Sequence, residues 1–100
     1  MIVETVEGPV GYEQWERLTE RFVETFQGFF PQAQESYLVQ DKDAEYRWRI
    51  ITVWRSLQAY DEYRKSSNVA AGVQVFRAIG TDPAYHVSNA VRISRFTDAG

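Results

Sequence analysis

The chain has 100 residues, of which 44% are hydrophobic and 15% aromatic, a composition that predicts one globular domain rather than a disordered segment. It has no cysteine, which excludes disulfides, thiolate catalysis and cysteine-based metal sites. The net charge of −3 is unevenly distributed. Residues 1–45 have 3 basic and 10 acidic side chains, whereas residues 46–100 have 8 basic and 4 acidic side chains. We therefore expect the two halves to attract each other, within a monomer or across a dimer.

The first part of the chain alternates between strand-like and helix-like patterns. The β-branched run at residues 2–7 predicts a strand, which a Gly-Pro step ends. Apolar residues then recur every three or four positions over residues 12–26, which predicts an amphipathic helix with Gly28 as its C-cap. Residues 33–40 predict the second strand.

The longest strand pattern covers residues 46–54. Its even positions are Tyr46, Trp48, Ile50, Thr52 and Trp54, and its odd positions are Arg47, Arg49, Ile51 and Val53. Because neither set is purely polar, we expect a central strand that is covered on both faces.

After this strand the period changes to that of a helix. Ser56 is placed to N-cap a short helix over residues 57–65. The polar segment that follows interrupts it, and Asn68 can cap a further helix that ends at Gly80. Residues 84–94 alternate again and predict the fourth strand, with a loose tail behind it unless a partner orders that tail.

The element order β-α-β-β-α-β predicts an α+β, ferredoxin-like sandwich in which a four-stranded antiparallel sheet carries its helices on one face. We expect a single domain over residues 1–100, with its core in about residues 1–95. The other sheet face, with Ile51 and Val53, is then left open. A symmetric homodimer that packs sheet against sheet is the simplest way to cover it.

Several short segments resemble segments of a known protein family. They are Gly28-Phe29, Val53-Trp54-Arg55-Ser56, Ala59-Tyr60, Tyr63-Arg64-Lys65-Ser66 and Phe76-Arg77-Ala78-Ile79-Gly80. Through them the chain resembles the antibiotic biosynthesis monooxygenase family of dimeric α/β barrels over roughly residues 1–95.

The resemblance implies a cofactor-independent monooxygenase, without metal or flavin, that acts on a small aromatic or quinone-like substrate between the helices and the sheet. By position, Trp54 and Tyr60 are the implied catalytic residues. Further side chains expected to bind the substrate are Phe26, Tyr37, Trp48, Tyr63, Val73, Phe76 and Arg77. Ordinary packing in the core remains the alternative interpretation of Trp54 and Tyr60.

His86 is the one side chain with an ordinary pKa near neutrality, which makes it a possible base. Its strand parity sets it opposite Tyr85 and Val87, so a position facing solvent or a dimer partner is the alternative.

A haem-degrading branch of the family uses an asparagine on the first strand and a histidine on the helix after the tryptophan. This chain has Glu4 and Thr5 on the first strand, and Arg64 and Ser66 on that helix. Haem binding is therefore not expected. With one histidine and no cysteine, no protein metal site is expected either.

Two other classes of function compete with an enzyme. One is a non-catalytic, dimeric ligand-binding or accessory domain of the same fold, which binds hydrophobic compounds without converting them. The other is an RNA-binding domain with the same element order, but residues 46–50 lack the glycine-containing aromatic motif and the chain is acidic, so no nucleic-acid partner is expected. No signal peptide or membrane-spanning run is visible, so we expect a cytoplasmic protein without a membrane partner.

Overall fold

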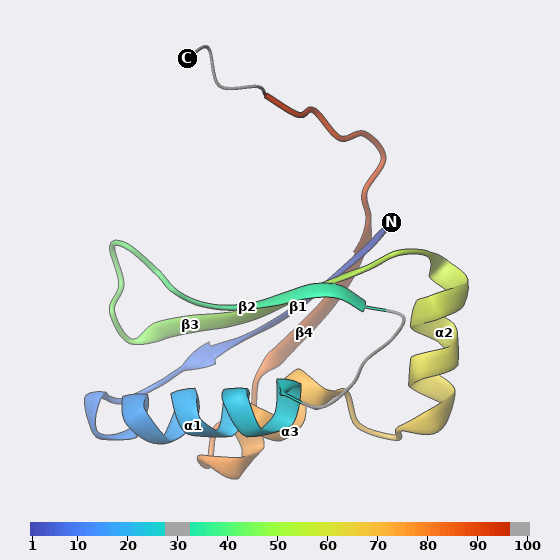
Figure 1. Ribbon diagram of the computed structural model, residues 1–100. Helices are drawn as coiled ribbons and strands as arrows, with labels where there is room; N and C mark the ends of the chain where they lie inside the picture. Colours follow the sequence, from blue (N-terminus) through green and yellow to red (C-terminus); the bar gives the residue numbers. More distant parts are fainter. Residues whose placement is uncertain (28–32, 97–100) are drawn as a thin grey trace.

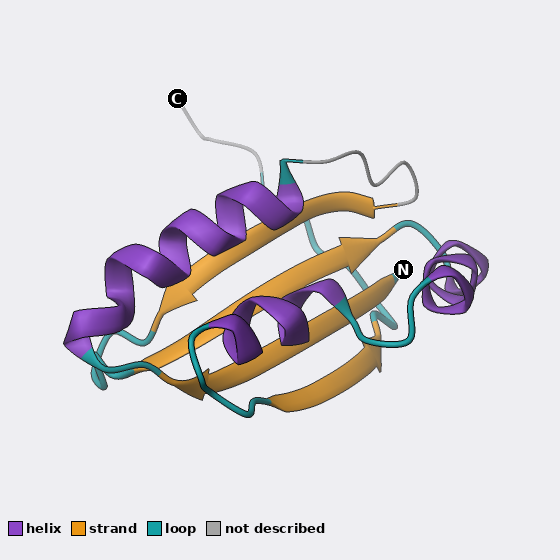
Figure 2. Ribbon diagram, turned by 90° about the horizontal axis from the view of Figure 1, so that it is seen from below, coloured by secondary structure: helices purple, strands orange, loops and turns teal. Residues whose placement is uncertain are grey.

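In the computed structural model, four strands form one antiparallel sheet in the order β2-β3-β1-β4 (Figure 1). The structure describes residues 1–27 and 33–96. The elements are β1 (Ile2–Pro9), the 3-10 helix η1 (Tyr12–Gln14), α1 (Trp15–Phe26), β2 (Ala33–Gln40), β3 (Arg47–Trp54), α2 (Leu57–Ser66), α3 (Ala71–Ala78) and β4 (Ala84–Asn89). Helices α1 and α3 lie across one face of the sheet, and α2 stands at its end (Figure 2). The predicted ferredoxin-like α+β fold is confirmed.

The central strand β1 decides which side chains enter the core. It pairs antiparallel with β3 and with β4, and Val6 lies opposite both Ile50 and Tyr85. Side chains alternate between the two faces of a strand, so the even positions of β1 and β3 point toward the helices. Val6 and Ile50 are each 1% exposed and belong to the main hydrophobic cluster, together with Phe76 of α3.

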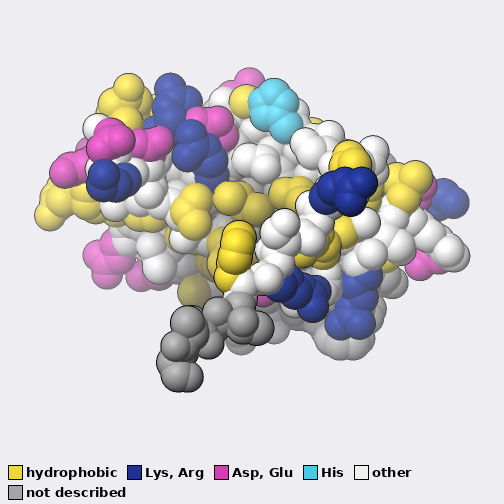
Figure 3. All heavy atoms as spheres, turned by 90° about the horizontal axis from the view of Figure 1, so that it is seen from above, with side chains coloured by type: hydrophobic (Ala, Val, Ile, Leu, Met, Phe, Trp, Pro, Cys, Tyr) yellow, Lys and Arg dark blue, Asp and Glu magenta, His cyan; other side chains and the backbone are white. Residues whose placement is uncertain are grey.

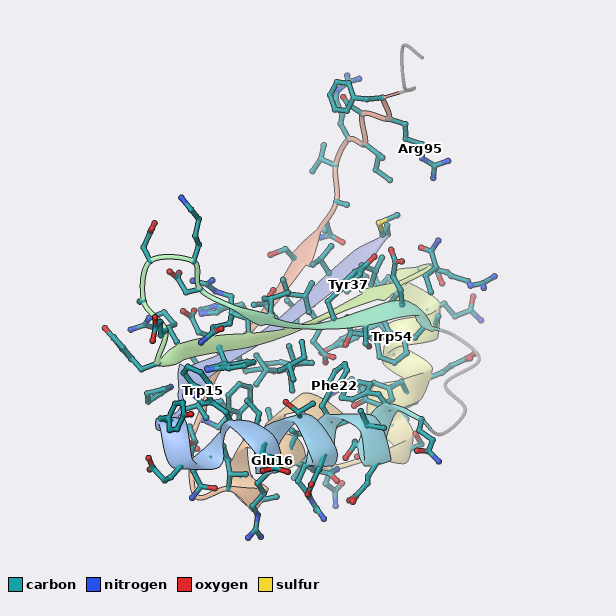
Figure 4. All side chains as sticks on the ribbon, turned by 60° about the vertical axis from the view of Figure 1, so that its left-hand side comes forward. Trp15, Glu16, Phe22, Tyr37, Trp54 and Arg95 are labelled. Carbon is teal, nitrogen blue, oxygen red and sulfur yellow. The ribbon has the colours of Figure 1, made fainter. Side chains whose placement is uncertain are left out.

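Helix α1 packs on the sheet with a few aromatic side chains and one leucine. Leu18 is completely buried, while Trp15 and Phe22 point toward the sheet and Glu16 points away from it (Figure 4). The first turn of the expected helix is a 3-10 helix, and Tyr12 there is 79% exposed, outside the predicted apolar stripe. The predicted C-cap Gly28 lies outside the described residues.

The second helical region is divided as predicted, but not with the predicted cap. The Ser56 hydroxyl accepts a hydrogen bond from the Ala59 backbone N–H at 3.0 Å, which confirms the N-cap of α2. Helix α3 begins at Ala71 without a side-chain cap, so the prediction that Asn68 caps it was wrong. Asn68 lies three residues before the start of α3, too early for an N-cap position, and its backbone carbonyl accepts a bond from Arg64. Among the described helices, none is both long and apolar enough to cross a membrane.

Strand β4 ends at Asn89, five residues earlier than the alternation predicted. Its neighbour β1 begins at Ile2, which pairs with Asn89, and the last backbone bond beyond that pair joins the Ala90 N–H to the Met1 carbonyl. Residues 91–96 therefore have no described strand beside them and leave the sheet (Figure 1). Phe96, 93% exposed, lies on this segment.

The sheet face opposite the helices carries ion pairs and apolar side chains (Figure 3). The Glu7 carboxylate on β1 contacts Arg47 at 2.9 Å and Arg49 at 3.1 Å, and Arg49 also lies 3.5 Å from Asp41. These pairs confirm that the acidic first half and the basic second half attract each other within one chain. Ile51 lies beside them on the same face.

Candidate active site

A carboxylic acid is buried on the helix side of the sheet. Glu4 follows the same alternation as Ile2 and Val6, so its side chain enters the interior, where it is 2% exposed. Buried carboxyl groups are rare unless they are paired or hydrogen-bonded, because a charge loses its hydration there. Glu4 is therefore the first candidate for a functional group.

Two tyrosines form a hydrogen-bonded chain that ends on Glu4. The Tyr85 hydroxyl of β4 donates to Glu4 Oε2 at 2.7 Å, and it also bonds the Tyr60 hydroxyl of α2. Because the single hydroxyl proton of Tyr85 is used on Glu4, Tyr60 must be the donor in the second bond. The chain thus runs from helix α2 through the edge strand to the central strand.

Burial is the largest influence on Glu4 and raises its pKa above the ordinary value. The hydrogen bond from Tyr85 opposes this effect, as do the nearby Trp54 indole and the positive charge of Arg64. Burial also raises the pKa of Tyr85, with the bonds to Tyr60 and Glu4 acting in the same direction. Near neutral pH, Tyr85 is therefore a neutral donor, and Glu4 is a stronger base than an exposed carboxylate.

Trp54 lies beside this network in the core. It is 1% exposed, its ring stacks on Tyr63 with centroids 4.4 Å apart, and Tyr60 meets it edge-on at 6.2 Å. Its indole N–H influences Glu4 but makes no hydrogen bond of standard geometry within the described residues. Figure 4 shows Trp54 on the helix side of the sheet.

A cavity of about 200 Å³ opens beside Tyr85, at the β4 edge of the sheet. Tyr85 forms one wall, and the end of α2, the connection to α3 and α3 itself form the others. Arg64 and Arg77 supply positive charge, while Val69 and Val73 supply apolar surface. Tyr85 thus lines the cavity and also donates its hydroxyl to the buried carboxyl of Glu4.

The structure distributes the residues expected from the sequence over three places. Trp54, Tyr60 and Tyr63 come together around Glu4, with Phe26 packed against them. Val73 and Arg77 line the cavity. Trp48 and Phe76 pack in the main hydrophobic cluster instead, and neither belongs to the wall of this cavity.

Tyr37 and His86 lie on the opposite face of the sheet. Tyr37 pairs with Ile51 and is 45% exposed, and His86 pairs with Thr5 and is exposed. Since successive side chains of a strand point to opposite faces, neither can reach a cavity on the helix side. The position of His86 agrees with the alternative of a histidine facing solvent or a partner.

Sequence reasoning did not identify Glu4, Tyr85 or Arg64 as site residues, although Glu4 and Arg64 were compared with the haem-degrading branch and Arg64 lies in a segment that carries the family resemblance. The available signal was an acidic residue between Ile2 and Val6 at an inward position of a strand. Nothing in the sequence indicated that Tyr85 would meet it, because that contact depends on which strand lies beside β1.

The residues around the cavity do not fit a metal or a haem group. Within residues 1–27 and 33–96, no group of three or more His, Cys, Asp or Glu side chains could hold a metal ion. The cavity wall offers no imidazole or thioether as an axial haem ligand. Its phenol, Tyr85, is already bonded to Glu4 and has a raised pKa, which opposes the phenolate form that iron would need.

Comparison with protein families identifies the fold family of the chain. The family model described as antibiotic biosynthesis monooxygenase matches residues 11–75. The chain belongs to this family. The match includes Trp54, Tyr60 and Arg64, whereas Glu4 and Tyr85 lie outside it. The antibiotic biosynthesis monooxygenase family thus accounts for one side of the candidate site, and the two terminal strands supply the other. No curated protein matches the sequence.

Solved structures with the same fold are distant in sequence. A proposed antibiotic biosynthesis monooxygenase from Deinococcus radiodurans has a TM-score of 0.75 at 13% identity, covering 98% of this chain and 100% of that chain. SnoaB from Streptomyces nogalater, a cofactor-independent oxygenase, has a TM-score of 0.65 at 14% identity, with 92% and 94% covered. An MhuD variant, with two manganese protoporphyrin IX groups per active site, has a TM-score of 0.69 at 14% identity, with 96% and 100% covered. At such identities the likeness shows the fold alone.

Proposed function

We propose that this member of the antibiotic biosynthesis monooxygenase family is a cofactor-independent monooxygenase that oxidises a small aromatic or quinone-like compound. One observation carries the proposal: the buried carboxyl of Glu4 is hydrogen-bonded by Tyr85, and Tyr85 forms one wall of a cavity. A proton acceptor in a dry site beside a cavity is what a reaction that starts by deprotonating its substrate requires.

The first step is proton removal through Tyr85. As the Tyr85 hydroxyl passes its proton to Glu4, the phenol oxygen takes one from an acidic C–H or O–H of the substrate, and the substrate becomes an anion. That anion gives its electrons to O₂. When the substrate carbon is a CH₂ group, one oxygen atom of O₂ becomes the carbonyl oxygen of the product. The other oxygen atom leaves as water, with the two hydrogens that the carbon has lost. One of these hydrogens returns from Glu4 through Tyr85. Tyr60 donates to Tyr85 and holds its orientation during the transfer.

The fold likeness to SnoaB supports this assignment, because that protein is a cofactor-independent oxygenase. The side chains around Glu4 fit a reaction of this class, since they combine a base, two phenols and a nearby cation without a metal ligand set. No haem is assigned, although an MhuD variant of the same fold holds a manganese protoporphyrin.

A non-catalytic ligand-binding domain is the second candidate. The observation that favours it is the complete burial of Trp54 at 1% exposure and Phe76 at 0%, which makes these aromatic residues part of the core rather than of an open pocket. Such a domain binds hydrophobic compounds and releases them unchanged.

We also propose a homodimer that packs sheet against sheet. The open face carries Ile51 and Tyr37, and Tyr37 is 45% exposed, so apolar surface is available next to the ion pairs of Glu7 (Figure 3). A second copy supplies a matching surface through two-fold symmetry.

Oxygen consumption with a panel of anthrones and naphthols tests the proposal. Turnover is expected for the wild-type protein, and Glu4→Gln is expected to lower kcat by about 10²- to 10⁴-fold, the usual contribution of a general base. Glu7→Gln is the matched control, because Glu7 lies on the same strand but on the opposite face. Ligand binding without oxygen uptake would favour the second candidate, and equal loss in both variants would remove Glu4 from the mechanism.

A further inference from the structure

Arg64 lines the cavity and forms no ion pair within the described residues. Of its terminal nitrogens, Nη1 is buried without a hydrogen bond, and Nη2 makes only a long bond of 3.5 Å to the Asn68 carbonyl. Its guanidinium carbon lies 5.9 Å from the centroid of the Tyr85 ring. Within the described part of the chain, no carboxylate comes within ion-pair distance of this guanidinium.

Several other arginines of the chain have a carboxylate within ion-pair distance. Arg47 and Arg49 contact Glu7, and Arg77, on the same cavity wall, has Asp82 at 3.7 Å. Arg64 is half-buried and still unpaired. The charge of Arg64 favours the carboxylate of Glu4, but Arg64 forms no ion pair with it. A partly buried cation without an ion pair is costly for the free protein, and an anion that binds it in the cavity would reduce this cost.

The shape and lining of the cavity restrict what can carry that anion. Val69 and Val73 form an apolar wall, which suits a hydrocarbon ring rather than a sugar or a phosphate chain. A volume of about 200 Å³ is below the ~300–1,000 Å³ typical of sites for drug-sized ligands, so one or two rings fit better than four. The planar fork of a guanidinium matches a carboxylate with two parallel hydrogen bonds.

We propose that the cavity binds a one- or two-ring aromatic carboxylate, with its carboxylate on Arg64 and its ring between Val69, Val73 and Tyr85. This inference names the substrate class for the proposed monooxygenase and rests on that function only for turnover, because the binding itself needs no reaction. The ring then lies against the phenol that leads to Glu4.

Binding of 2-naphthoate and its neutral analogue 2-naphthamide tests the proposal by calorimetry, without a chemical step. We expect the wild-type protein to bind 2-naphthoate roughly 10- to 100-fold more tightly than 2-naphthamide, which is the range for hydrogen bonds to a charged partner. Arg64→Gln should abolish this preference, while Arg64→Lys should keep part of it. Arg55→Gln is the matched control, because Arg55 is exposed and does not line the cavity, and its preference should equal that of the wild type.

Three results overturn the inference: no binding of 2-naphthoate to the folded wild-type protein, equal binding of the two compounds, or a preference that survives in Arg64→Gln. If Arg64→Gln does not fold, Arg64→Lys and the wild-type comparison still decide.

The outcome of this binding test is separable from that of the proposed function. Arginine-dependent binding without any oxygen uptake supports the carboxylate site and contradicts the monooxygenase, whereas turnover of neutral phenols without a carboxylate preference does the reverse. 2-Naphthalenesulfonate distinguishes a carboxylate site from one for any aromatic anion, and tighter binding of the sulfonate would overturn the assignment of the carboxylate.

Discussion

The hydroxyl of Tyr85 donates to the carboxylate of Glu4 at 2.7 Å, although the two residues are 81 positions apart in the chain. Their strands, β4 and β1, are neighbours in the sheet, and both side chains point toward the helices. This bond links the buried carboxyl to the cavity, so the properties of Glu4 are the most direct test of the site.

Glu4→Gln should change the pH dependence of stability. The folded-state pKa of Glu4 is raised above its ordinary value of 4.5, so the folded protein binds this proton more tightly than the unfolded chain does. The contribution to stability is therefore complete below about pH 4.5 and is lost as the pH rises through the folded-state pKa. Relative to Glu4→Gln, the wild-type protein should lose about 1.4 kcal/mol for each unit by which the pKa is raised. Thermal unfolding of both proteins from pH 4 to pH 8 measures this difference, and a difference that stays constant with pH would contradict it.

For Glu7 the dependence of stability on pH should be opposite: the wild-type protein should gain stability relative to Glu7→Gln as the pH rises. Hydrogen bonding to Arg47 is the largest cause that lowers the pKa of Glu7, and Arg49 adds to it. The stabilisation is present above the unfolded-state pKa and disappears as the pH falls through the folded-state value. The variant should be less stable than the wild type at pH 7, and the two should converge in acid. The loss should be smaller in 1 M salt, which screens ion pairs near the surface. A variant as stable as the wild type at pH 7 in low salt would show that the pairs contribute nothing.

Tyr85→Phe should raise the pKa of Glu4 further, because it removes the hydrogen bond that favours the carboxylate. Tyr60→Phe is the control, since it leaves the bond from Tyr85 to Glu4 in place. The carboxyl carbon of Glu4, followed by NMR with ¹³C-labelled glutamate, reports both values. An unchanged pKa in Tyr85→Phe would mean that the bond does not persist in solution.

Gly72→Ala should destabilise the fold by about 1–3 kcal/mol, as overpacked cores do. A Cβ at Gly72 would lie 2.9 Å from Cγ2 of Val6, a branched side chain held in the central strand, and 3.5 Å from Cγ2 of Ile50. Gly11→Ala is the matched control, because the nearest atoms there belong to the end of the flexible Glu13 side chain. Urea unfolding compares the two variants, and equal midpoints would show that α3 does not pack this closely on the sheet.

Ile51→Glu should dissociate the proposed homodimer. The substitution places a charge in the middle of the open sheet face, where a two-fold interface would bring it next to its own copy. Val23→Glu is the control, because Val23 is 51% exposed on helix α1, away from that face. Sedimentation velocity should give a dimer for the wild type and the control and a monomer for Ile51→Glu. A monomeric wild-type protein would end the dimer proposal.

The fold could be predicted from local patterns, because each element carries its own signal. Residues 33–40 form a strand with the predicted bounds, and Ser56 caps α2 through its own side chain. The site could be predicted only in part. Tyr60 and Trp54 follow from family resemblance, but the partners of Glu4 are fixed by the position of β4 beside β1, which no local pattern encodes. The predicted end of β4 was wrong for the same reason, because the observed end is determined by the residue at which β1 begins.

The position of Glu4 and Tyr85 on the first and fourth strands has a consequence for how the protein is made. During synthesis Glu4 emerges early, but its hydrogen-bond donor follows 81 residues later. Until β4 has left the ribosome and paired with β1, the inward carboxyl has water as its partner instead of a phenol. Leu18 and Ile50 of the main hydrophobic cluster are therefore synthesised well before the candidate site can be complete.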